Sequence, residues 1–266
     1  MSKVHVISDL YLDFNENSAS EEVIPTETDL VIINGNISKH IKRAFLYIET
    51  LCRLYPDVQF VVNLGEKERY SGPEKRIDEL MDNIEARSVS NASWPKNLHF
   101  SRKPILITLR DGVKVDVLCT YGFPEIHSYN GDWEDTSWHK NIHVDVLYDF
   151  FGENSKYKPI GTSNVEHGMV PVFASQQDIN RFHAQETKTA RDWELTPSVI
   201  KILVTHINPY KDSRCENQSV TPYNIHLEKG YWIGSNTQVN GIRFVGAKLY
   251  ANPGRGVEAR SRIFHI

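Results

Sequence analysis

VQFVVNLGEKERY, residues 58–70, is the stretch that decides the fold of this chain. Residues 58–62 form a short apolar run rich in β-branched side chains, which is typical of a buried strand. The loop Asn63-Leu64-Gly65 follows the run, and the charged segment Glu66-Lys67-Glu68 comes next. Because α/β folds build their sites at the carboxyl ends of strands, the stretch predicts a buried strand that leads into a functional loop.

The same arrangement recurs along the chain. Four other apolar runs are each followed by a polar or glycine-containing segment. These segments are Asp9-Leu10-Tyr11, Gly35-Asn36, Thr205-His206 and Gly234-Ser235-Asn236-Thr237. Apolar runs over residues 4–10 and 30–33 predict two further buried strands at the start of the chain. Helical periodicity appears over residues 41–55 and 76–86. This alternation of strands and helices predicts a layered α/β fold.

Shorter strand patterns follow residue 95. We expect strands over 98–100, 105–109, 113–119, 199–204, 231–233, 241–245 and 248–251. The turn sequence Arg110-Asp111-Gly112 predicts a hairpin. The pattern weakens between residues 123 and about 185, where we expect an irregular capping segment, although 175–192 has helical character. No linker divides the chain, which predicts a single domain over residues 1–266.

The composition narrows the class of protein. The chain has 266 residues, a formal net charge of −4 at pH 7, 40% hydrophobic residues and three cysteines. No apolar run approaches the ~20 residues of a membrane span, and residues 1–7 lack the features of a secretory signal. No basic stripe points to a nucleic-acid partner, and the spacing of the cysteines disfavours a disulfide framework. We therefore expect a cytoplasmic protein that contacts neither membrane nor nucleic acid.

The series of strand ends resembles the calcineurin-like metallophosphoesterase family. In that family, successive strands are followed by Asp-x-His, Gly-Asp, Gly-Asn-His-Glu/Asp, His and Gly-His-x-His. Residues 65–70 are similar to the family's Gly-Asn-His-Glu-Phe-Tyr, and residues 203–209 to its Val-Val-Thr-His-His-x-Pro. Residues 251–256 resemble its closing Asn-Pro-x-Gly turn. The resemblance implies a four-layer α/β/β/α sandwich and a metal site at the strand ends.

Most of the family's site residues are replaced in this chain. Two metal-ligand positions are kept, at Asp9 and His206. The replaced positions are Tyr11 for the first histidine, Asn36 for the aspartate that bridges both metals, Glu66 for the asparagine, Lys67 for the catalytic histidine, and Ser235 and Thr237 for the last two histidines. The loss of the anionic bridge and of three imidazoles predicts that two divalent ions no longer bind, and we expect neither a metal nor another cofactor.

Lys67 places an ammonium group where the family has its catalytic histidine. A lysine of ordinary pKa is a poor general acid at neutral pH, so no residue is assigned a catalytic role. One hypothesis is that Lys67 pairs with Asp9, Glu66 or Glu68 and partly replaces a cation. The alternative is that its side chain points to solvent.

The sequence therefore favours a non-catalytic binding or scaffold protein whose partner is another protein. One alternative is an active metal-dependent phosphoric ester hydrolase acting on a nucleotide or phosphoprotein. It would use Mn²⁺ or another divalent ion at a single weak site formed by Asp9, Asn36, Glu66 and His206. A second alternative is a sensor that binds a phosphate-bearing small molecule without cleaving it. His5, within the first strand, is interpreted as a core histidine.

Overall fold

The computed structural model describes thirteen stretches of the chain. They are residues 2–8, 10, 12, 24–38, 40–65, 68, 77–122, 176–195, 200–206, 230–234, 241–245, 248–252 and 261–266.

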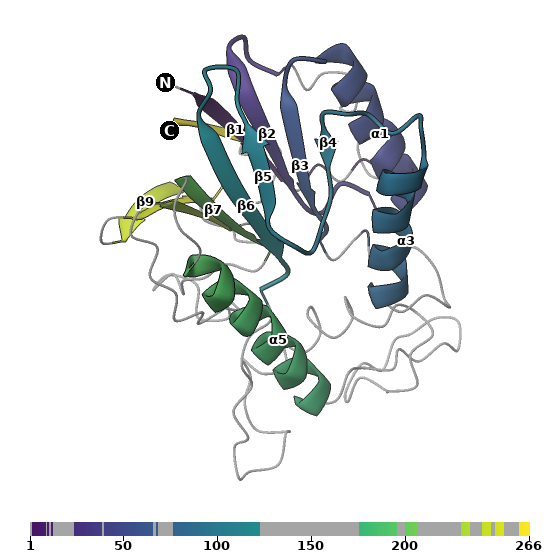
Figure 1. The fold of residues 1–266 in the computed structure, drawn as a ribbon, viewed down its shortest axis with the longest axis vertical. Helices are drawn as coiled ribbons and strands as arrows, with labels where there is room; N and C mark the ends of the chain where they lie inside the picture. Colours follow the sequence, from purple (N-terminus) through teal and green to yellow (C-terminus); the bar gives the residue numbers. More distant parts are fainter. Residues whose placement is uncertain are drawn as a thin grey trace, which may run out of the picture.

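Eleven strands in the described residues form two sheets (Figure 1). The first sheet has the order β11-β1-β2-β3-β4, with β1 Lys3–Ile7, β2 Thr28–Asn34, β3 Gln59–Asn63, β4 Leu98–His99 and β11 Ser261–His265. The strands β1 to β4 run parallel, and β11 pairs antiparallel with β1.

The second sheet has the order β5-β6-β7-β8-β10-β9. Its strands are β5 Ile105–Thr108, β6 Lys114–Thr120, β7 Ile200–Thr205, β8 Gly230–Gly234, β9 Gly241–Val245 and β10 Lys248–Asn252. The four inner strands β6, β7, β8 and β10 are parallel, and the terminal strands β5 and β9 are antiparallel to their neighbours. Parallel strands with both faces covered are buried throughout, which explains their uninterrupted apolar runs.

The side chains of β2 alternate between two apolar layers, and all seven of its residues are buried. Val31 and Ile33 pack in one cluster with Ile48 of α1 (Ile41–Leu54). Leu30 and Ile32 point the other way and pack against the second sheet. The helix α3 (Ile77–Ser90) lies on the same side of the first sheet as α1 (Figure 1).

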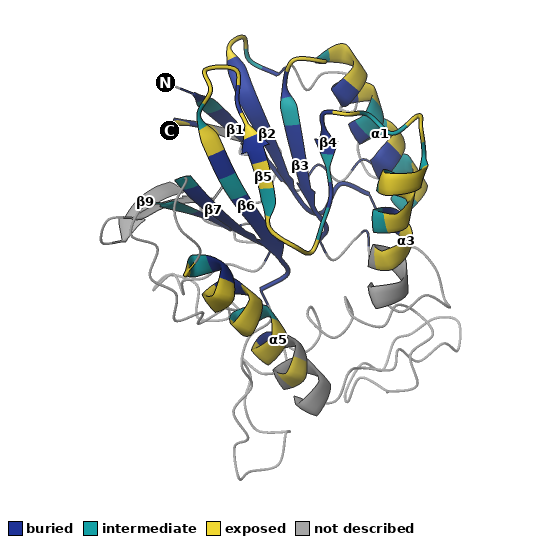
Figure 2. Ribbon diagram, viewed as in Figure 1, coloured by how far each residue is buried: buried dark blue, intermediate teal, exposed yellow. Residues whose placement is uncertain are grey.

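A third apolar layer covers the outer face of the second sheet. Leu118 of β6, Leu203 of β7 and Trp232 of β8 pack with Ala190 and Trp193 of α5 (Gln176–Glu194). The order of layers is therefore helix, sheet, sheet, helix, with buried residues concentrated in the strands (Figure 2). The expected four-layer α/β/β/α sandwich is confirmed.

Strand β11 was not predicted. Its sequence, SRIFH, has no continuous apolar run, because only one face of this terminal strand is covered: Phe264 is buried and Ile263 is exposed. The strand brings the chain ends together, since Ser2 N–H donates to Ile266 O (3.2 Å) and Ile266 N–H donates to Ser2 O (3.0 Å).

The predicted helices and other strands that fall on described residues are confirmed, with small shifts at their ends. Helix α3 continues to Ser90 rather than ending at residue 86. The helix predicted over residues 175–192 is confirmed as α5, which packs an apolar face on the second sheet and contains residues 176–185 of the predicted capping segment. Residues 123–175 of that segment lie outside the described residues.

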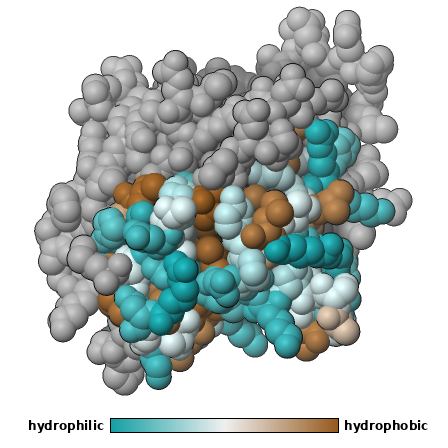
Figure 3. Space-filling view, turned by 90° about the horizontal axis from the view of Figure 1, so that it is seen from above, coloured by the Kyte–Doolittle hydropathy of each residue, from teal (hydrophilic) through white to brown (hydrophobic). Residues whose placement is uncertain are grey.

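The described surface is mixed in character. On the face shown in Figure 3, apolar residues are scattered among hydrophilic ones over the described part. None of the helices in the described part of the chain combines the length and the apolar character that a bilayer span requires.

Candidate functional site

Two buried asparagines tie together the carboxyl ends of four strands. The side-chain amide of Asn34, at the end of β2, donates to the carbonyl oxygen of Thr205 on β7 (2.8 Å). The amide of Asn63, at the end of β3, donates to Asn34 Oδ1 and to the carbonyl oxygen of Thr120 on β6 (both 2.9 Å). These bonds join the two sheets at the edge where the sequence predicts the site.

The chain turns sharply after β2. Gly35 and Asn36 have φ angles of 77° and 57°, in the left-handed region that glycine and asparagine tolerate best. Asn36 is fully buried in this turn. The turn therefore fixes the position of Asn36 through the backbone itself.

His206 lies directly against this turn. A Cβ atom on Gly35 would be 2.7 Å from His206 Nδ1, and a Cβ atom on Gly65 would be 2.7 Å from His206 Cε1 and 2.9 Å from Asn36 Oδ1. Both glycines are therefore required by the close approach of the imidazole and the amide. The ring of Tyr121 also stacks on the imidazole of His206, with 5.4 Å between the two ring centroids.

Glu68 holds the loops after β2 and β3 together. One of its carboxylate oxygens accepts the backbone N–H groups of Asn36 (3.0 Å) and Gly65 (2.8 Å). The other accepts those of Ile37 (2.5 Å) and Ser38 (3.0 Å). The side chain is fully buried. Sequence reasoning treated Glu68 only as a partner for Lys67 and missed this role.

The protonation of Glu68 follows from this geometry. Burial raises the pKa of the carboxyl group, and the surrounding backbone N–H donors oppose that rise. A proton on either oxygen would point toward N–H donors, so the arrangement fits the ionised carboxylate. Each oxygen already accepts two donors, so Glu68 does not require Lys67 as a counter-ion.

A second carboxylate orders the loop after β6. Glu186 of α5 accepts the backbone N–H groups of Tyr121 (2.8 Å) and Gly122 (3.0 Å). The contact links α5 to the loop that carries the ring stacked on His206. Sequence reasoning missed it, because nothing in the sequence pairs residues separated by more than sixty positions.

A solved structure shares this architecture. The phosphopantetheinyl hydrolase from Mycobacterium tuberculosis is similar over 99% of this chain and 95% of its own, with a TM-score of 0.63 and 11% sequence identity. The chain has the calcineurin-like metallophosphoesterase fold. The protein TT1561 from Thermus thermophilus is similar over 96% of this chain and 89% of its own, with a TM-score of 0.48 and 12% identity. No protein-family model and no curated protein matches the sequence.

The metallophosphoesterase fold places two of the sequence-predicted site residues side by side. Asn36 and His206 lie together at the strand ends, as the glycine geometry shows. The other predicted positions lie outside the described residues, and their assignments stay predictions: Asp9, Tyr11, Glu66, Lys67, Ser235 and Thr237. The pairing of Lys67 with Asp9, Glu66 or Glu68 is likewise a prediction.

Of the positions that the family resemblance assigns to a metal centre, Asn36 and His206 fall within the described stretches. Asn36 and His206 offer a neutral amide and an imidazole, neither of which carries the negative charge that a pair of dications needs between them. Glu68, whose oxygens accept four backbone N–H groups, is directed at the protein rather than at an ion. Within the described stretches, no group of three or more His, Cys, Asp or Glu side chains could hold a metal ion.

Proposed function

We propose that this chain is a metallophosphoesterase-fold protein without the dinuclear metal centre, and that it acts in the cytoplasm as a non-catalytic binding protein for another protein. The observation that supports this most directly is the chemistry of the turn after β2. The position of the family's bridging aspartate is a buried neutral amide, Asn36, and the neighbouring buried carboxylate, Glu68, is engaged by backbone N–H groups.

The size of the electrostatic effect supports the proposal. Two +2 ions about 4 Å apart repel each other by roughly 17 kcal/mol at an effective dielectric constant of about 20. A bridging carboxylate offsets this repulsion because it attracts both ions at once. An asparagine at the same place supplies an oxygen ligand without the charge, so it leaves most of the repulsion in place.

Metal content and turnover test the proposal together. Purified protein is incubated with Mn²⁺, dialysed and measured by inductively coupled plasma mass spectrometry, and then assayed with p-nitrophenyl phosphate and its bis ester. We expect well under one metal ion per chain and no turnover. Asn36→Asp is the matched variant, because aspartate tolerates the same left-handed backbone and restores the charge. We expect this variant to bind Mn²⁺ more tightly than the wild-type protein does.

Two results would overturn the proposal. The first is about two tightly bound ions per chain in the wild-type protein. The second is turnover that disappears in both Asp9→Ala and His206→Ala, which would establish an active phosphoesterase. A single bound Mn²⁺ with such turnover would identify the mononuclear alternative at Asp9, Asn36, Glu66 and His206.

The phosphate sensor makes a different prediction. It requires donors for a phosphate group, but the backbone N–H groups of residues 36, 37, 38 and 65 already donate to Glu68. A sensor would therefore depend on Lys67. A rise in melting temperature with nucleotides, absent with Mn²⁺ and abolished by Lys67→Ala, would favour the sensor over the protein-binding scaffold.

A further inference from the structure

The terminal strand β5 exposes a backbone edge. It is the first strand of the six-stranded sheet and pairs only with β6 among the described strands. Leu109 N–H donates to Val113 O (2.8 Å) in the hairpin that joins β5 to β6. Hydrogen-bonded and non-hydrogen-bonded pairs alternate along an antiparallel ladder. The backbone N–H and C=O groups of Leu106 and Thr108 therefore point away from β6, toward the open edge.

The side chains of this strand leave the edge accessible. Leu106 is 62% exposed. Thr108 is also exposed, whereas Ile107 between them is buried in the core between the sheets. The other terminal strand on this side, β4, differs, because the indole N–H of Trp94 donates to its Leu98 carbonyl (2.9 Å) and occupies that part of its edge.

Three lysines lie near the open edge, and the acidic residue in register with β5, Asp116 opposite Leu106, interacts with Lys201. Lys96, Lys103 and Lys114 are all exposed, and their ammonium groups make no ion pair within the described part of the chain. The nearby Arg102, by contrast, pairs with Asp82. The lysines disfavour a second copy of the same edge and favour an acidic partner.

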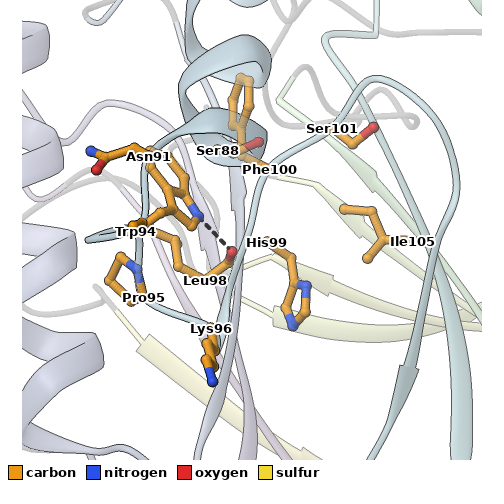
Figure 4. Close-up of a pocket in the computed structure, with 11 residues that line it drawn as sticks. Ser88, Asn91, Trp94, Pro95, Lys96, Leu98, His99, Phe100, Ser101 and Ile105 are labelled. Atoms are coloured by element: carbon orange, nitrogen blue, oxygen red, sulfur yellow. Dashed lines mark hydrogen bonds between the residues drawn. The ribbon is translucent and has the colours of Figure 1, made fainter.

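A pocket of about 470 Å³ adjoins the start of β5 (Figure 4). Its wall includes the apolar side chains of Trp94, Leu98, Phe100 and Ile105, and Lys96 lies at its rim. Ile105 belongs to both the pocket and the strand. A chain running along β5 would therefore reach the pocket with its next few residues.

We propose that the β5 edge, with this pocket, binds an extended acidic peptide segment of a partner protein as an added strand. Backbone groups of Leu106 and Thr108 hydrogen-bond the segment, the lysines attract its carboxylates, and a bulky apolar side chain enters the pocket. This inference shares one assumption with the proposed function, namely that the partner is a protein. Its test measures peptide binding and not metal content or turnover, so either idea can fail without the other.

The probe is a fluorescein-labelled peptide of alternating glutamate and valine with one terminal tryptophan, and its binding to the full chain is followed by fluorescence anisotropy. Replacing tryptophan by alanine should weaken binding several-fold. Two further peptides carry N-methyl groups, one on the valine nitrogens and one on the glutamate nitrogens, because alternate residues of a strand point their N–H groups to opposite sides. The peptide that loses the donors facing β5 should bind about tenfold or more weakly, as expected for two or more lost hydrogen bonds. A peptide with lysine in place of glutamate should bind at least about tenfold more weakly.

Matched protein variants locate the site. Lys103→Glu, beside β5, should weaken binding of the acidic peptide about three- to tenfold, and Lys188→Glu, exposed on α5, should change it less than about twofold. Binding unchanged by N-methylation at the valines and also at the glutamates would overturn the proposal, because no added strand would then be formed. Sedimentation as a dimer that excludes the peptide would also overturn it, since a second copy would then occupy the edge.

Discussion

Replacing Glu68 by glutamine should strongly destabilise the protein although it changes the side chain by a single atom and removes one charge. The glutamine oxygen can accept only two of the four backbone N–H groups that Glu68 binds, and its NH₂ group would face the other two. A hydrogen bond to a charged group contributes roughly 1.5–3 kcal/mol, so the loss of two lowers the free energy of unfolding by about 3–6 kcal/mol. That is a large fraction of the roughly 5–15 kcal/mol typical of a folded domain.

Urea unfolding followed by circular dichroism measures this loss. Glu27→Gln is the matched control, because the Glu27 side chain is 88% exposed and its ion pair with Lys3 spans 3.9 Å. We expect the control to change the free energy of unfolding by no more than about 0.5 kcal/mol. A loss below about 1 kcal/mol in Glu68→Gln would refute the reasoning, since Glu68 would then not hold the two loops together.

Three further perturbations test other parts of the structure. Gly65→Ala should destabilise the protein by about 2–4 kcal/mol in urea unfolding, because the new Cβ would lie 2.6 Å from Asn36 N and 2.7 Å from His206 Cε1. An unchanged urea midpoint would contradict the close approach of Gly65 to these two residues. Burial lowers the pKa of His5 to about 4, so the unfolded chain binds the extra proton between pH 6.5 and 4. The contribution of His5 to the free energy of unfolding is fully present above about pH 6.5, and the free energy of unfolding falls by about 3 kcal/mol as the pH drops to 4. His5→Phe should flatten this pH dependence. An identical slope in the variant would exclude His5 as its source. Asn97→Ala should lower the free energy of unfolding by about 2–4 kcal/mol, because the Asn97 amide donates to three carbonyl oxygens at the end of α1 and in the turn before β3. A loss under about 0.5 kcal/mol would show that water replaces these hydrogen bonds.

The layers of the fold could be predicted because strands that are buried on both faces have uninterrupted apolar runs in the sequence. Strand β2 is buried at every residue, and its apolar run is visible without a structure. Helix α1 shows the complementary pattern, with Ala44, Ile48 and Leu51 buried on one side. Strand β11 could not be predicted, because a terminal strand with one covered face needs few buried apolar residues: Phe264 is buried, whereas the adjacent Ile263 is exposed.

The candidate site could be predicted only in part. The order of strand ends along the chain was enough to anticipate that Asn36 and His206 meet. The role of Glu68 depends on a turn some thirty residues earlier, whose N–H groups converge on its carboxylate only after both strands pair. Asn34 and Asn63 are similar, because each looks like an ordinary strand end until the two sheets face each other.

Residues 2 and 266 hydrogen-bond each other across the edge of the first sheet. A short linker between these two residues would therefore close the backbone into a ring with little strain, and the exposed hairpin at Gly112 offers a place to open it again. A circular permutant made in this way should keep both sheets. The same proximity would let the whole unit be inserted into a surface loop of a host protein, since it would enter and leave the host at almost one point.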